Sequence, residues 1–141
     1  MKLFSLNFGV IFLVVGLIIF VHLKAWGEDW VYLESAQDGD TFYDGKGITH
    51  QSGNFVKVKV KVVFTKEEVE KKIRTGGKKY KSLSYSISFI EISCKNKTGR
   101  VSTVHDYSQD GKTIYVSNLT SNWMPIHTGR IVDKLHQIVC K

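Results

Sequence analysis

Most signatures of catalysis and of cofactor binding are missing from this sequence. No glycine-rich phosphate loop follows a strand, and no metal-ligand spacing relates the cysteines to the histidines His50, His127 and His136. The pair His105-Asp106 is the nearest approach to a catalytic pair, but adjacent residues on a strand point to opposite faces. The sequence therefore predicts that the protein is not an enzyme and has neither a cofactor nor a metal ion.

The N-terminal segment predicts export from the cytosol. A basic start at Lys2 precedes an uncharged apolar run over 8–21, and Ala25-Trp26-Gly27 then has small residues where a signal peptidase requires them. The apolar run falls below the roughly 20 residues that span a bilayer, which favours a cleaved signal peptide over a retained membrane anchor. We therefore expect a signal peptide at 1–27, in contact with the membrane only transiently, and one domain at 28–141.

Cysteine is scarce, with only Cys94 and Cys140 in the chain. An exported chain meets an oxidising compartment, so a disulfide is favoured over two free thiols. A redox site is disfavoured, because such sites usually have C-x-x-C spacing. Neither cysteine lies near the expected cleavage point, which excludes lipid attachment there. Closing a loop of about 46 residues would stabilise the fold by roughly 4 kcal/mol.

The remaining pattern is mainly that of β-strands. From Val56 to Val62 valine and lysine alternate strictly, as in a strand with one buried face in an antiparallel sheet. Apolar and β-branched runs between turn signals predict five further strands, at 30–35, 41–43, 80–94, 100–106 and 112–118. Near Phe89-Ile90 the apolar parity slips, and we expect a bulge there to exchange the buried face of that strand.

Two segments have helical character. Residues 66–74 are rich in helix formers, and we expect a short surface helix that Thr65 caps and Gly76-Gly77 ends. Apolar residues recur at helical spacing from Ile131 to Val139, which predicts an amphipathic helix with Thr128 as its cap.

The elements combine into an α+β fold, mainly β. We expect about six antiparallel strands in one sheet, a C-terminal α-helix packed on one face, and the short surface helix. Cys140 would end the C-terminal helix, and its bond to Cys94 would tie that helix to the end of the 80–94 strand. Between strands and helix, Trp123 is expected to pack into the core at the end of the sheet.

Basic side chains outnumber acidic ones. Outside the expected signal peptide the chain has 18 Lys and Arg residues but only 13 Asp and Glu residues. The surface should therefore attract polyanions or acidic protein patches. The candidate partner-binding residues lie on one strand face and around the 80–94 strand, where Tyr80 and Tyr85 also lie; they are Lys57, Lys59, Lys61, Lys78, Lys79, Lys81, Lys95, Lys97 and Arg100. The alternative is that these lysines only discourage edge-to-edge aggregation.

A series of motifs follows in a fixed order along nearly all of 28–141. It comprises Trp30, Phe42-Tyr43-Asp44, the valine–lysine strand, Glu91-Ile92-Ser93-Cys94, Arg100, Asp106-Tyr107, Asp110-Gly111, Trp123-Met124-Pro125-Ile126 and Leu135-His136-Gln137-Ile138-Val139-Cys140. The ordered set resembles the surface-adhesin protein E family of Gram-negative bacteria. The resemblance implies an antiparallel sheet flanked by a C-terminal helix and, for the best-known members, adhesion to host extracellular-matrix proteins.

The chain departs from the family pattern in three places. Lys59 stands where the family often has an aromatic residue, His127-Thr128-Gly129 replaces a Pro-Gly-Ser entry to the last helix, and the connection over 66–77 is longer. These departures leave the fold intact and weaken any transfer of ligand specificity.

Together these features predict an exported, non-catalytic binding module in the periplasm or at the cell surface of a Gram-negative bacterium. It would be an adhesin that engages an acidic protein or a polyanionic ligand, not nucleic acid, through a basic sheet face. The alternative is a periplasmic structural or assembly protein that binds a partner of its own cell. A homodimer is compatible with either reading.

Overall fold

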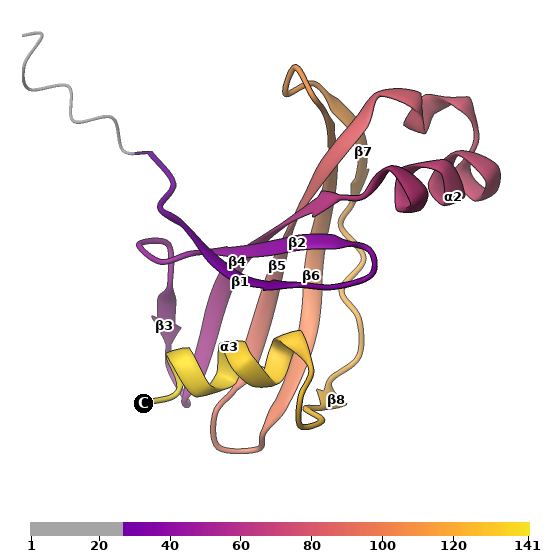
Figure 1. Cartoon of the computed structure of the whole chain (residues 1–141). Coiled ribbons are helices and arrows are strands. Elements are labelled where there is room, and N and C mark those ends of the chain that lie inside the picture. Colours follow the sequence, from indigo (N-terminus) through magenta and orange to yellow (C-terminus); the bar gives the residue numbers. More distant parts are fainter. Residues whose placement is uncertain (1–26) are drawn as a thin grey trace, which may run out of the picture.

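The computed structural model describes residues 27–141 (Figure 1). The expected signal peptide, apart from Gly27, lies outside the described residues and stays a prediction. The elements in chain order are β1 (Trp30–Ser35), β2 (Gly39–Asp44), β3 (Thr49–Gln51), β4 (Phe55–Phe64), α2 (Lys66–Gly76), the 3-10 helix η1 (Lys78–Ser82), β5 (Leu83–Ser93), β6 (Thr98–Ser108), β7 (Thr113–Ser117), β8 (Met124–Pro125) and α3 (Ile131–Val139).

The strands form one antiparallel sheet, as the sequence predicts. Its order is β1-β2-β4-β5-β6-β7, with the short strand β3 paired to β4 and the two-residue strand β8 paired to β6. The β1–β2 hairpin crosses in front of β4, β5 and β6, and α3 lies below the hairpin (Figure 1). Hairpin and helix thus contribute to the same core, which Leu33 of β1 and Leu135 of α3 both contact.

The core lies between the layer formed by the β1–β2 hairpin and α3 and the side of β4 that carries its valines. Val56, Val58 and Val60 are at most 2% exposed, and Leu135 is fully buried against them. The intervening lysines therefore lie on the opposite face, because side chains alternate along a strand. The prediction of a half-buried β4 is confirmed.

The expected exchange of the buried face within β5 is wrong. β5 pairs with β4 in unbroken register from Phe55↔Ser93 to Val63↔Tyr85. The register shift opposite Phe89-Ile90 is real, but the extra residue is Ser102 of β6. Because β5 keeps its alternation from Tyr85 to Ser93, the apolar residues of this stretch divide between two faces: Ile90 and Ile92 contribute to the core, and the other face carries Tyr85, Ile87 and Phe89.

Helix α2 begins and ends as the sequence predicts. The Thr65 side chain accepts a hydrogen bond from the backbone N–H of Glu68 at 3.2 Å, which caps the first turn. At the other end Gly77 has φ 90°, a conformation that favours glycine. No residue of α2 is buried, so it is the surface helix that we expected.

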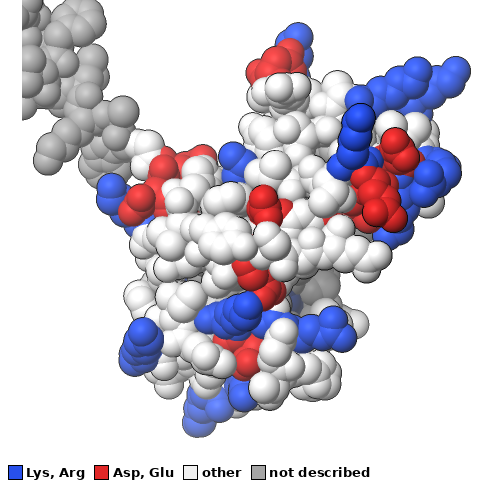
Figure 2. Space-filling model, in the orientation of Figure 1, with Lys and Arg blue, Asp and Glu red and all other residues white. Residues whose placement is uncertain are grey.

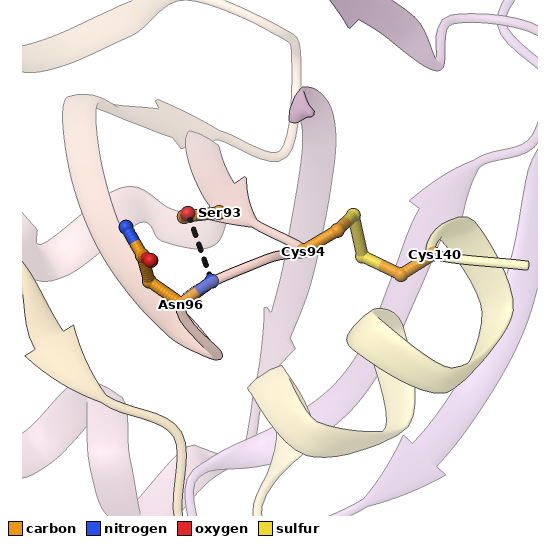
Figure 3. Close-up of a disulfide and its surroundings, with 4 residues drawn as sticks. All are labelled: Ser93, Cys94, Asn96 and Cys140. Carbon is orange, nitrogen blue, oxygen red and sulfur yellow. Dashed lines mark hydrogen bonds between the residues drawn. A yellow bond between two sulfur atoms is a disulfide. The ribbon is translucent and has the colours of Figure 1, made fainter. Parts of the chain in front are cut away.

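Helix α3 is fixed at both ends. Thr128 is not its cap; Arg130 occupies the N-cap position without a side-chain cap bond, and the Asp133 carboxylate accepts the N–H of Gly129 at 3.1 Å instead. At the other end, Cys140 forms the predicted disulfide with Cys94, whose Cα lies 5.5 Å away and which directly follows β5 (Figure 3). The bond therefore ties the helix to the end of β5.

A lysine and aromatic face on the open side of the sheet

The side of β4 that faces away from α3 carries a set of cations and rings. We call it the lysine–aromatic face and define it by eight residues: Glu28, Trp30, Lys57, Lys59, Lys61, Tyr85, Phe89 and Arg100. β4 supplies the lysines, and its register with β5 places Lys59 opposite Phe89 and Lys57 opposite Glu91. Strict alternation in β4 is the local reason that all three amines emerge on one side.

Aromatic rings orient two of these lysines. The Nζ of Lys57 lies 4.6 Å from the ring centroid of Phe89. The Nζ of Lys61 lies 4.5 Å from the ring of Tyr85 and 5.5 Å from that of Trp30. A ring attracts an ammonium group through its quadrupole but carries no net charge. Both amines are therefore held in place while their positive charge stays available.

Lys59 is held differently, by the start of the domain. Its Nζ lies 2.8 Å from Glu28 Oε1, and the other oxygen of Glu28 accepts a hydrogen bond from Trp30 Nε1 at 3.1 Å. The side chain of Glu28 thus links the segment before β1 to β4, and its negative charge offsets one positive charge of the face. The pair is partly exposed, with 26% and 41% of the two side chains accessible, so water can compete for it.

Arg100 of β6 extends the face toward β8. Its Nε and Nη2 lie 2.7 and 2.6 Å from Glu91 Oε2, and its guanidinium carbon lies 4.5 Å from the ring centroid of Trp123. Trp123 is 37% exposed and also contacts the ring of Phe55, so the expectation that it is a core residue is wrong. It lies on the lysine–aromatic side because the guanidinium that it covers belongs to that face of the sheet.

The pair His105-Asp106 shows the opposite orientations that the sequence predicts. Asp106 is buried, 3% exposed, and accepts a hydrogen bond from the Ser86 hydroxyl. His105 Nδ1 lies 3.3 Å from the Tyr107 hydroxyl, and the Tyr107 ring stacks on Tyr85 at 5.1 Å. The two neighbours therefore have separate partners.

The other basic candidates lie elsewhere. Lys78, Lys79 and Lys81 belong to η1, before β5, whereas Lys95 and Lys97 lie in the turn after it. A strand of 11 residues separates them, a length of roughly 35 Å. Lys97 moreover lies 3.9 Å from Asp133 of α3. The nine candidates thus form three separate groups, of which only the β4 lysines and Arg100 share the lysine–aromatic face.

Residues 30–141 match the family model described as surface-adhesin protein E. The chain belongs to the surface-adhesin protein E family. No curated protein and no solved structure matches the chain. Membership confirms the family resemblance seen in the motifs.

In this surface-adhesin protein E domain, the family description suggests a non-enzymatic, exported or cell-surface adhesin. Over residues 27–141, no helix is long and apolar enough to cross a membrane, and no group of at least three His, Cys, Asp or Glu side chains could hold a metal ion. Sequence reasoning missed Glu28, Trp30, Phe89 and Trp123 as members or neighbours of the face. Only the unbroken alternation of β5 could have placed Phe89 there.

Proposed function

We propose that the protein is a non-catalytic adhesin-type module that binds an acidic segment of a partner protein through the lysine–aromatic face. The observation that carries the proposal is the placement of the Lys57 and Lys61 amines over aromatic rings on one open side of the sheet. Family membership supports a binding role, and the chemistry of the face supports an acidic partner.

Two physical features favour binding at this face. Its amines are oriented before a partner arrives, so less side-chain entropy is lost when a carboxylate docks between them. The rings beneath them are half-buried, so they offer apolar contact to the same partner. Neither Lys57 nor Lys61 forms an ion pair within residues 27–141, so a partner carboxylate need not displace an internal one.

The test is binding of the purified, disulfide-bonded protein to immobilised extracellular-matrix proteins and to heparin, a model polyanion, at increasing salt. We expect the double substitution Lys57→Gln/Lys61→Gln to weaken binding by about tenfold, because each lost charge pair contributes on the order of 0.5–1 kcal/mol. A matched control replaces Lys46 and Lys112 by Gln. These side chains are 76% and 83% exposed and lie outside the face.

Equal binding by the double variant and the control would show that the face is not the contact surface. Binding that persists at about 1 M salt would exclude an electrostatic contact, because charges are then screened beyond about 3 Å. Capture of a periplasmic protein of the same cell, with no affinity for matrix proteins, would favour the structural or assembly role.

A further inference from the structure

The segment that projects beside the sheet carries almost all of the net positive charge of the described domain. We call α2 and η1 together the arm. Residues 66–81 contain seven basic and three acidic side chains, whereas the remainder of 27–141 contains eleven and ten. Figure 2 shows the blue side chains gathered over α2 and its neighbourhood at the upper right, with red ones between them.

Packing does not explain this concentration of charge. No residue of α2 or η1 is buried, and Lys71–Glu68 is the one ion pair found within the arm. The side chains of Lys66 and Lys81 are exposed and have neither an ion pair nor a ring contact in the described part of the chain. The arm therefore presents cations to whatever lies outside the protein.

Two of these cations, Lys66 and Lys81, line a groove at the base of the arm. The groove has a volume of about 320 Å³ and is lined by residues of α2, the end of η1 and the start of β5. Apolar side chains of Phe64, Val69 and Leu83 line it, and none of its lining residues is acidic. Two ammonium groups beside apolar walls match a ligand with a phosphate and an attached hydrocarbon part.

We propose that this groove binds the phosphate headgroup of an anionic phospholipid, and that the rest of the arm contacts the surrounding lipid surface. An inorganic phosphate ion would use the lysines but not the apolar walls, and a sulfated polysaccharide has no hydrocarbon part to place against them. Several basic side chains near an anionic leaflet act additively, each worth about a factor of five in affinity. The arm would thus hold the domain against a membrane and leave the lysine–aromatic face to its own partner.

The experiment is co-sedimentation of the whole disulfide-bonded protein with vesicles of phosphatidylcholine, with or without phosphatidylglycerol. We expect binding only to the anionic vesicles and its loss at about 1 M salt. The variant Lys66→Gln/Lys81→Gln should bind more than about twenty-five-fold more weakly, because it loses the contacts in the groove in addition to two cations near the leaflet. Arg74→Gln/Lys78→Gln changes the arm outside the groove and should weaken binding by no more than that factor.

Two controls separate this proposal from a mere charge effect and from the proposed adhesin function. Lys46→Gln/Lys112→Gln lowers the net charge by the same amount as the groove variant Lys66→Gln/Lys81→Gln. It should nevertheless bind vesicles as the unchanged protein does. Lys57→Gln/Lys61→Gln should also keep vesicle binding, although it impairs partner binding. The proposal would be overturned by equal binding to neutral vesicles or by displacement of the protein with millimolar inorganic phosphate. It would also be overturned if the protein bound heparin but not vesicles, or if Lys66→Gln/Lys81→Gln bound vesicles as well as the unchanged protein.

Discussion

Asp133 and Gly129 are joined across the start of α3, where the Gly129 N–H donates to Asp133 Oδ2 at 3.1 Å. The same carboxylate oxygen accepts Gln137 Nε2 at 3.2 Å, and the Asp133 residue is only 3% exposed. A side chain in the first turn thus reaches back to the backbone before the helix, in the manner of a capping box. It takes the role that the sequence pattern predicts for Thr128.

The first prediction compares these two residues. Asp133→Ala should lower the free energy of unfolding by about 1–2 kcal/mol, because it leaves two donors without their acceptor at a partly buried helix start. Thr128→Ala should change it by less than about 0.5 kcal/mol, as expected for an exposed residue without a role. Urea denaturation followed by circular dichroism measures both. A larger loss for the Thr128 variant would contradict the assignment of Asp133 as the cap.

The second prediction concerns the bond between Cys94 and Cys140, which closes a sequence separation of 46 residues. The double variant Cys94→Ala/Cys140→Ala should be less stable by about 4 kcal/mol, because its unfolded chain regains the entropy of the open loop. Urea denaturation gives the difference directly. As a control, adding reductant should destabilise the unchanged protein and leave the double variant unaffected. A loss below about 1 kcal/mol would mean that α3 is held by packing alone.

The third prediction uses the ion pair between Glu28 and Lys59 to test the proposed function. Glu28→Gln should release the Lys59 amine and strengthen binding of an acidic partner about two- to fivefold, the range of a partly exposed pair. Asp29→Asn is the matched control, because Asp29 is the next residue and its carboxylate lies 4.0 Å from Lys46, which is outside the face. Equal gains from both variants would attribute the effect to net charge and not to Lys59.

The fourth prediction concerns the β6–β7 turn, where the hydrogen bond from Ser108 and then that from Lys112 lower the pKa of Asp110 below 3.8. Because the folded pKa is the lower one, the contact stabilises the fold above the unfolded pKa and is lost as pH falls through the folded value. Carboxyl NMR titration should therefore place the Asp110 midpoint below 3.8 in the unchanged protein. Ser108→Ala should raise it, and Lys112→Gln should raise it less. An unchanged midpoint in the Ser108 variant would exclude the hydroxyl as the main cause.

Sequence patterns were most informative where one local rule decided the outcome. The two-residue period of β4 predicted its buried valines and open lysines, and Thr65 with Gly77 predicted both ends of α2. The cysteines at the ends of a strand and a helix predicted how α3 is attached to the sheet. The first two signals depend on neighbours within a few residues, and the third depends on there being only two cysteines to pair in the sequence.

Prediction failed where two strands had to be compared. Phe89-Ile90 indicates a parity change, but the chain alone does not say whether β5 or its neighbour takes the extra residue. Ser102 of β6 takes it, and Phe89 consequently lies beneath Lys57 on the open face. Trp123 was misplaced for a related reason, since it contacts Arg100 of β6 and Phe55 of β4, which are distant from it in the sequence.

The sequence by itself determined six of the strands, both α-helices, the antiparallel pairing, the disulfide and the surplus of positive charge, but not β8 or the 3-10 helix η1. Only the tertiary structure decided how that charge is distributed among the β4 face, the arm and the turn after β5. The physical reason is that alternation fixes which side of its own strand a residue faces, whereas register, strand length and the covering helix fix which residues of other strands lie beside it. The 11 residues of β5 therefore separate lysines that the sequence analysis had grouped into one candidate surface.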